Sequence, residues 1–238
     1  MRPPVGQVEG KKQAVEQMFD TIAPRYDLLN RVLSMGIDQG WRKRVVDLLR
    51  EDSPRHILDV ATGTADLALA AAQLKPEHIT GVDIAEGMLD VGRKKIANQG
   101  LSQKINLQRG DSESLPFTAE SFDAVTVAFG VRNFENLQAG LSEMRRVLRP
   151  GGKLVVLEFS KPNHFPIKQL YSFYFRHVLP RIGSTVSGVS GPYQYLNESA
   201  MAFPDGAAFV AELVKAGYQK PTAEPQTFGI ATIYTAIK

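Results

Sequence analysis

The sequence predicts an α/β fold in which helices cover both faces of a doubly wound, mostly parallel sheet. Between residues 56 and 160, short apolar segments typical of buried strands alternate with longer segments of helical periodicity. Such alternation produces consecutive β-α units, whose strands run parallel. The length of 238 residues fits one domain with a single good-sized core.

Each element of this core has its own local signals. The first predicted helix consists of strong helix formers and ends before Pro76, and the second stops at Gly100, where a left-handed cap costs little. The third ends at the turn Pro150-Gly151-Gly152. We therefore expect strands at 56–60, 78–82, 105–108, 122–127 and 153–157, and helices at 65–74, 85–98 and 136–148.

Further elements precede and follow the core. Apolar positions recur at helical spacing from 14 to 49, and Pro24 and Gly36 divide them into two or three short helices. After Lys161 the alternation breaks until a helix at 205–216 and two strands, 218–223 and 230–237, close enough in sequence to pair antiparallel. We divide the chain into amino-terminal arm and helices (1–55), ligand-binding core (56–160), insertion (161–203) and a final helix with a strand pair completing the sheet (204–238).

Composition excludes several classes of function. Cysteine is absent, which removes disulfides and thiolate chemistry and is typical of a reducing compartment. No secretory segment and no apolar stretch approaching the roughly 20 residues of a membrane span is present, so we expect a cytoplasmic protein. The net charge of +3 is scattered, so we expect no nucleic-acid partner. We expect no metal site, because the histidines lack ligand spacing: His56, His78, His164 and His177.

The turn after the first predicted strand is the first candidate binding site. Asp59, Gly63 and Thr64 lie where an open α/β sheet binds ligands, and Gly63 permits a backbone shape that a side chain would obstruct. From residue 59 to residue 74 there are acidic residues but no Lys or Arg. The loop therefore suits a cation better than a phosphate.

Carboxylates also follow the next two strands. Asp83, twenty positions after Gly63, is placed to accept hydrogen bonds from both hydroxyls of a ribose, and Asp111, with Ser112, to accept from an adenine amino group. One such Asp is more often a helix cap or turn former. Three in succession beside a glycine turn favour a positively charged nucleoside, and S-adenosylmethionine, with its sulfonium and ammonium groups, is such a cofactor.

A nicotinamide dehydrogenase is the main alternative on this fold. Its fingerprint Gly-x-Gly-x-x-Gly is replaced here by Gly-Thr-Ala-Asp-Leu-Ala at 63–68, which places a methyl group where the pyrophosphate would approach the backbone. A P-loop is excluded, because neither Gly-Lys-Ser nor Gly-Lys-Thr follows the glycine.

Three segments carry a resemblance to a known family. They are Tyr-Asp-Leu-Leu-Asn at 26–30, followed by Leu33-Ser34 and Trp41; Phe-Gly-Val-Arg-Asn at 129–133; and Arg-Val-Leu-Arg-Pro-Gly-Gly-Lys at 146–153. With them the chain resembles, almost from end to end, the ubiquinone and menaquinone biosynthesis C-methyltransferase family. The resemblance implies a class I, Rossmann-like S-adenosylmethionine-dependent methyltransferase fold. It also implies that this cofactor is bound by Thr64, Asp83, Asp111 and Ser112.

Three positions depart from the family pattern. Ala65 stands where the family usually has Gly, Asp38 where it usually has His, and Ala128 where it usually has Ser. We expect Ala65 to shift the cofactor slightly. Asp38 removes an imidazole that could have accepted a proton.

The resemblance further implies the reaction, C-methylation of demethylmenaquinol to menaquinol in menaquinone biosynthesis. The acceptor is a prenylated quinol, because a ring that has lost a hydroxyl proton pushes charge onto the neighbouring carbon, which can attack the sulfonium methyl. The alternatives are methyl transfer to another small molecule, such as a ubiquinone precursor, and a non-catalytic S-adenosylmethionine-binding protein.

For this chemistry we expect the catalytic residues to be Arg132 and Asn133, after the fourth strand. Arg132 would stabilise the developing phenolate or hold a water that takes the proton, and Asn133 would orient the ring hydroxyl. The alternative is an ion pair or a turn. We expect the acceptor to be bound by Tyr26, Asn30, Tyr193 and Tyr195.

We expect the insertion to form a lid. Residues 161–197 carry Lys, Arg and many aromatic residues but no Asp or Glu. Such a surface suits anionic lipid headgroups, from which a lipid-soluble acceptor must be collected. The hypothesis is peripheral contact with the inner face of the membrane. The alternative is packing within the lid or between subunits of a homo-oligomer.

Overall fold

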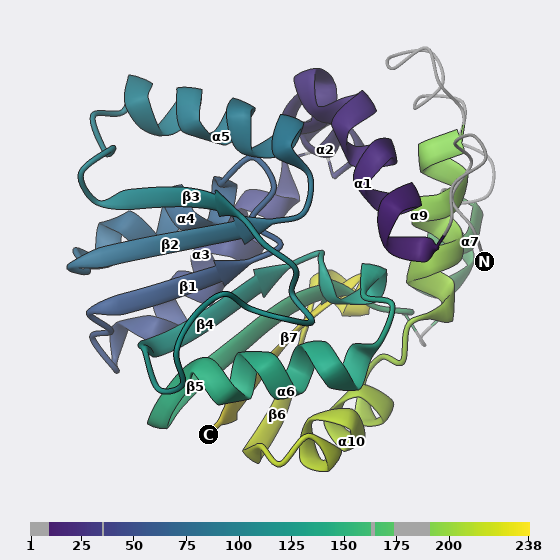
Figure 1. The fold of residues 1–238 in the computed structure, drawn as a ribbon. Helices are drawn as coiled ribbons and strands as arrows, with labels where there is room; N and C mark the ends of the chain where they lie inside the picture. The colour runs from purple at the N-terminus through teal and green to yellow at the C-terminus, as the bar shows by residue number, and fades with distance from the viewer. Residues whose placement is uncertain (1–9, 35, 163–164, 174–190) are drawn as a thin grey trace.

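The computed structural model describes residues 10–34, 36–162, 165–173 and 191–238. Its centre is a seven-stranded sheet of order β3-β2-β1-β4-β5-β7-β6 (Figure 1). β1 to β5 pair in parallel, and β7 runs antiparallel between β5 and β6. The strands are β1 (His56–Val60), β2 (His78–Asp83), β3 (Ile105–Arg109), β4 (Phe122–Ala128), β5 (Leu148–Phe159), β6 (Gln219–Gln226) and β7 (Ala231–Ile237). The order reverses between β1 and β4, which places a ligand crevice beyond their carboxyl ends.

Helices cover both faces of the sheet (Figure 1). In β5, Leu154 and Val156 join the core on one face, and Val155 and Leu157 join the core on the other. Successive side chains of a strand point to opposite faces, so a strand that is apolar throughout is buried on both. The first core contains α6 (Leu137–Val147) and α10 (Ala207–Lys215), and the second α3 (Ile37–Arg50), α4 (Asp66–Ala71) and α5 (Glu86–Asn98).

The remaining helices gather near the carboxyl ends of the parallel strands (Figure 1). Pro24 lies in a 3-10 turn, η1 (Ala23–Arg25), and Gly36, with φ +77°, begins α3, so both residues divide the amino-terminal helices as predicted. A second 3-10 turn, η3 (Val131–Asn133), follows β4. The helices of this group are α1 (Lys11–Ile22), α2 (Tyr26–Leu33), α7 (Ile167–Phe173) and α9 (Gly191–Ala202).

The predicted core elements and the antiparallel strand pair are confirmed, with one difference in β5. This strand begins at Leu148, directly after α6, instead of at Lys153. Phe122 pairs with Leu148 and Ala124 with Lys153, so the residues between Leu148 and Lys153 form a bulge inside the strand. The Pro-Gly-Gly turn is therefore part of the strand, because Leu148 already pairs with β4.

In the part of the insertion that the structure describes lie two helices, α7 and α9, that the sequence pattern did not predict. In α9, polar and apolar residues do not separate onto two faces, so the periodicity that marks other helices is weak. Within the described ranges, no helix is long and apolar enough to cross a membrane. The same ranges hold no group of three acidic or histidine side chains arranged for a metal ion.

Candidate active site

Two adjoining cavities lie beyond the carboxyl ends of β1, β2 and β4. The larger encloses about 710 Å³, part of it open to solvent, and the smaller about 360 Å³. Their shared lining residues include Tyr26, Gly63 and Phe129. Each predicted cofactor-binding residue lines one or both: Gly63, Asp83, Asp111 and Ser112 the larger, and Asp59, Gly63 and Thr64 the smaller.

Asp83, the last residue of β2, holds the glycine turn in place. Its Oδ2 accepts a hydrogen bond from the backbone N–H of Gly63 at 2.8 Å, and its Oδ1 accepts from Ala85 at 2.9 Å. Gly63 has φ +54°, where a side chain is strained, and a Cβ there would lie 3.3 Å from Met88 Cε. A carboxylate has about four lone-pair sites, so Asp83 keeps acceptor capacity for a ligand in the cavity.

Asp111 lies under α1. Its Oδ1 accepts from the backbone N–H of Glu113 at 2.9 Å, and its Oδ2 pairs with Lys12 Nζ at 2.8 Å. Lys12 also lies 3.0 Å from Glu113 Oε2, and Lys11 donates to the carbonyl of Phe134. These contacts fasten α1 over the larger cavity. A ligand amino group at Asp111 would therefore compete with Lys12.

Asp59 is the most deeply buried carboxylate of the smaller cavity, with 1% of its surface exposed. Its two oxygens accept hydrogen bonds from the hydroxyls of Thr62, at 2.6 Å, and Thr126, at 2.7 Å. Burial raises the pKa of Asp59 to about 6, and these hydrogen bonds oppose the rise. Burial also raises the pKa of Asp83 to about 6.

We expect the affinity for a cationic ligand to fall as the pH falls through about 6, because protonation of Asp59 or Asp83 removes the charge that attracts it. The stability of the fold itself has the opposite pH dependence and falls as the pH rises. A raised carboxyl pKa contributes stability that is present below the ordinary pKa and is lost as the pH rises through about 6. Calorimetry between about pH 5 and 8 tests the trend in affinity, and urea unfolding between about pH 4 and 7 tests the trend in stability. An affinity that does not change with pH would contradict this expectation.

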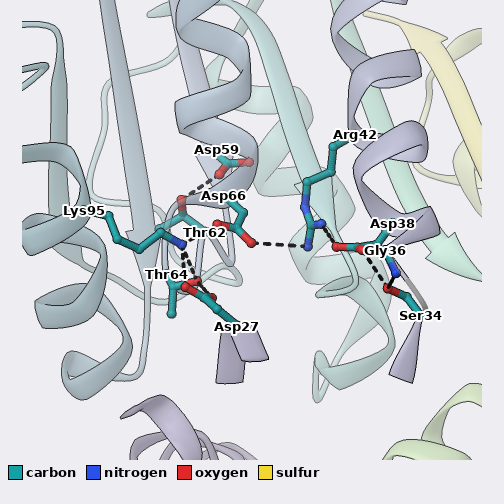
Figure 2. Close-up of polar contacts among 10 residues, drawn as sticks. All are labelled: Asp27, Ser34, Gly36, Asp38, Arg42, Asp59, Thr62, Thr64, Asp66 and Lys95. Carbon is teal, nitrogen blue, oxygen red and sulfur yellow. Dashed lines mark hydrogen bonds and ion pairs between the residues drawn. The ribbon is translucent and has the colours of Figure 1, made fainter. Parts of the chain in front are cut away.

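Thr64 joins the loop that is predicted to bind the cofactor to α2 and α5 (Figure 2). Its hydroxyl donates to Asp27 Oδ1 at 2.5 Å. Lys95 Nζ lies 2.7 Å from Asp27 Oδ2, donates to the Thr64 hydroxyl at 3.3 Å, and pairs with Asp66. The Thr64 hydroxyl is thus engaged as donor and as acceptor within the protein, and it fastens α2 beside the loop.

Tyr26 and Asn133 line the larger cavity from opposite elements, α2 and η3. Burial raises the pKa of Tyr26, and a hydrogen bond with Asn30 opposes the rise. The Oδ1 of Asn133 is buried and has no hydrogen-bond partner among the described residues. Three residues predicted from the sequence therefore lie near one another, and the Asn133 oxygen is available to a ligand hydroxyl.

Arg132 lines neither cavity. Its guanidinium forms an ion pair with Glu158 Oε1 at 2.6 Å, donates to the carbonyl of Phe129, and lies over the ring of Phe159 at 5.4 Å. Both charged side chains are almost completely buried. The ion pair that the sequence left open as the alternative for Arg132 is therefore present.

The positive charge of Arg132 nevertheless acts on the phenol groups nearby. Burial raises the pKa of Tyr26, Tyr171 and Tyr195, and in each case the charge of Arg132 opposes that rise. Tyr195, on α9, packs against Val15 on α1, and its hydroxyl has no partner among the described residues. Tyr193 lies on the same helix, but its side chain is outside the described part of the structure.

The model of the ubiE/COQ5 methyltransferase family matches residues 7–238. The chain belongs to this family. The demethylmenaquinone methyltransferase of Bacteroides fragilis is 49% identical over 97% of this chain and 95% of its own length. The demethylmenaquinone methyltransferase of Deinococcus radiodurans is 48% identical over 100% of this chain and 98% of its own length. The ubiquinone/menaquinone biosynthesis C-methyltransferase UbiE of Geobacter sulfurreducens is 46% identical over 96% of this chain and 90% of its own length.

Solved structures show the methyltransferase fold at much lower identity. A putative S-adenosyl-L-methionine-dependent methyltransferase from Methanococcus maripaludis is 17% identical, with a TM-score of 0.68 over 98% of this chain and 97% of the other. A phosphoethanolamine N-methyltransferase from Haemonchus contortus, in complex with S-adenosyl-L-methionine, is 15% identical, with a TM-score of 0.67 over 98% and 60%. The sheet order and helix layers are therefore those of class I S-adenosylmethionine-dependent methyltransferases, as predicted.

Four charged residues of this methyltransferase site were not predicted: Lys12, Asp27, Arg42 and Lys95. Asp27 belongs to the Tyr-Asp signature at 26–30, so the signal was present but had no assigned role. The other three are basic residues on helices that also carry other Lys or Arg residues. Only the folded chain distinguishes them, because Lys12 and Lys95 pair with carboxylates on other elements, and Arg42, whose partner Asp38 is on the same helix, lines a cavity formed with other elements.

Proposed function

We propose that this methyltransferase transfers the methyl group of S-adenosylmethionine to a ring carbon of demethylmenaquinol, which gives menaquinol. The observation that carries the proposal is the pair of adjoining cavities, which joins the strand-end carboxylates to the amide oxygen of Asn133, for which the described part of the chain offers no hydrogen-bond partner. The near full-length similarity to demethylmenaquinone methyltransferases supports the choice of acceptor.

The residues of the cavities fit this methyl donor. When bound, S-adenosylmethionine supplies a methyl group on a positively charged sulfur. We assign Asp83 to the ribose hydroxyls, and Asp111 with Ser112 to the adenine end, because these groups line the larger cavity. Asp59 is assigned to the ammonium group, since it is a buried acceptor in the smaller cavity.

At the acceptor end, Asn133 accepts a hydrogen bond from a ring hydroxyl and so orients the ring. Arg132 lines neither cavity and is held in place by its ion pair with Glu158, so it acts through its charge. Its charge favours ionisation of a phenol nearby, as it does for three tyrosines of the protein, and the acceptor is itself a phenol. The ring carbon of the acceptor would form the new bond to the methyl group as the methyl–sulfur bond breaks, with the electron pair of that bond staying on sulfur. The carbon would then lose its proton to solvent or a bound water, which restores the aromatic ring.

A ubiquinone precursor is the second candidate acceptor, because some relatives bear a name that covers both quinones. Lipids extracted from a bacterial strain that lacks the methyltransferase separate the candidates. Expression of this chain is expected to convert accumulated demethylmenaquinone into menaquinone. If expression restores methylation of a ubiquinone precursor alone, that precursor is the acceptor and the proposed acceptor is wrong. If the chain binds S-adenosylmethionine but no methylated quinone forms, the protein is non-catalytic.

We further propose that the insertion binds the cytoplasmic face of the membrane. Phe165, Phe173 and Met201 are more than half exposed on or beside α7 and α9, and Lys168 is exposed on α7. Apolar side chains beside basic ones favour adsorption to anionic lipid. Other basic residues of the predicted lid, Arg176 and Arg181, lie outside the described residues.

Vesicle co-sedimentation tests the membrane proposal. Replacing Phe165 and Phe173 by Ser is expected to weaken binding to anionic vesicles about tenfold or more, because each buried aromatic side chain contributes about 1.5–3 kcal/mol. Val214→Ser, an exposed apolar residue on α10, is the matched control and is expected to change nothing. Equal sedimentation of all three proteins, or binding that ignores lipid charge, would contradict the proposal. If the wild-type protein instead forms oligomers as its concentration rises, and the variant with both Phe replaced does not, these residues form a contact between subunits.

A further inference from the structure

The smaller cavity contains a buried cation that the account above does not use. Arg42, on α3, is 8% exposed and lines this cavity together with Gly63 and Thr64. Among the described lining residues it is the only cation, and the others with charge are Asp59 and Asp66. A buried guanidinium is costly unless each part of it is paired, so its position at a cavity wall needs a reason.

Arg42 is held firmly from one side. Asp38, one helical turn earlier, forms an ion pair with its Nη1, and the Ser34 hydroxyl donates to the other Asp38 oxygen at 2.6 Å (Figure 2). The guanidinium also lies over the Phe129 ring, with Cζ 5.8 Å from the ring centroid. These contacts fix the orientation of the group before any ligand arrives, which lowers the cost of binding one.

The second terminal nitrogen of Arg42, Nη2, has a weaker contact than the first. Arg42 Nη2 lies 3.8 Å from Asp66 Oδ2, beyond hydrogen-bond distance (Figure 2). Asp66 itself is paired with Lys95, whose charge competes for it. A guanidinium has five N–H donors, and the described contacts leave several of them for a group in the cavity. An anion with two oxygens fits such a fork best.

We propose that Arg42 binds the α-carboxylate of the methionine part of S-adenosylmethionine, and that Asp38 positions the guanidinium for it. This assignment rests on the proposed function, since it concerns the same methyl donor. The amino-acid end of that donor carries one positive and one negative group. Asp59 and Arg42, both in the smaller cavity, supply the complementary charges, and Asp111 lines only the larger cavity.

Calorimetry with two donors tests the assignment. Decarboxylated S-adenosylmethionine retains the adenosine, the sulfonium and the ammonium, and lacks only the carboxylate. The wild-type chain is expected to bind S-adenosylmethionine about 10- to 100-fold more tightly than the decarboxylated form, as expected for a charge-assisted hydrogen bond. Arg42→Gln is expected to reduce this ratio to about one while affinity for the decarboxylated donor stays within about threefold. Asp38→Asn is expected to give an intermediate ratio, because it loosens the guanidinium without removing it.

Arg44→Gln is the matched control, because Arg44 lies on the same helix but is exposed and pairs with Glu224. Loss of Arg42 leaves Asp38 buried without its partner, so the double variant Asp38→Asn/Arg42→Gln, which removes both charges, repeats the test in a chain without that penalty. An unchanged ratio in both Arg42 variants, or equal weakening of both donors, would overturn the assignment and leave the proposed function intact. Failure of the wild type to bind either donor would overturn both.

Discussion

Replacing Asp83 by Asn is expected to weaken binding of S-adenosylmethionine about 100-fold or more. Both carboxylate oxygens already accept backbone N–H groups, from Gly63 and Ala85, so an Asn side chain must present its NH₂ group to one of these donors. The variant also loses the negative charge assigned to the ribose hydroxyls. Loss of one or two charge-assisted hydrogen bonds costs about 1.5–3 kcal/mol each, which corresponds to at least a tenfold change per bond.

Calorimetry measures this effect directly, and the exposed carboxylate of Asp90, farther along α5, offers the control. Asp90→Asn is expected to leave the affinity unchanged, because the Asp90 side chain is 61% exposed and pairs with the partly exposed Arg93. The Asp83 variant should remain folded at neutral pH, since burial already disfavours the ionised carboxyl. A donor affinity equal to that of the wild type in Asp83→Asn would contradict the assignment of this carboxylate.

Replacing Arg132 by Met is expected to destabilise the fold by about 3–5 kcal/mol, because Glu158 would remain as a buried charge without its partner. Glu158 is 0% exposed, and it also accepts from the backbone N–H of Phe159. The double variant Arg132→Met/Glu158→Gln removes the charge and is expected to recover most of that stability. Urea unfolding of the two variants measures the difference.

Methyl transfer by the double variant then separates packing from electrostatics. We expect its kcat to remain about 100-fold or more below that of the wild type, with donor affinity nearly unchanged, because the charge that favours the phenolate is missing. The pH at which the reaction rate rises should also be higher in the double variant, since the acceptor phenol ionises less readily once the positive charge of Arg132 is removed. Full recovery of kcat in the double variant would show that Arg132 serves only to support the fold.

Much of the fold could be predicted from the sequence because the central strands β1, β2 and β4 are short and mostly buried, and because segments of strong helix formers follow β1 and β2. Leu148 shows the limit of that approach, since a residue at the end of a helical pattern begins β5 once it pairs with Phe122. The helix α9 shows another limit, because its burial depends on α1 and η3, which lie far from it in sequence. Pairing partners and tertiary burial override local pattern in both cases.

The candidate site divides in a similar way. Asp59, Asp83 and Asp111 could be predicted because strand ends of a parallel sheet converge on one crevice, which depends only on the order of elements. Arg132 was expected at the reacting ring, but its orientation depends on Glu158, at the end of β5. Arg42 could not be predicted, because its place depends on Phe129 and on a cavity whose lining comes from elements other than its own helix.

Transfer of an isotopically labelled methyl group from S-adenosylmethionine tests the central claim most directly. The purified chain is incubated with demethylmenaquinone in its reduced form and, separately, in its oxidised form. We expect label on a ring carbon of the product only with the reduced acceptor, because the electron-poor quinone cannot attack the methyl group. Absence of label with the reduced acceptor under conditions where the donor binds, or equal labelling of both forms, would contradict the account.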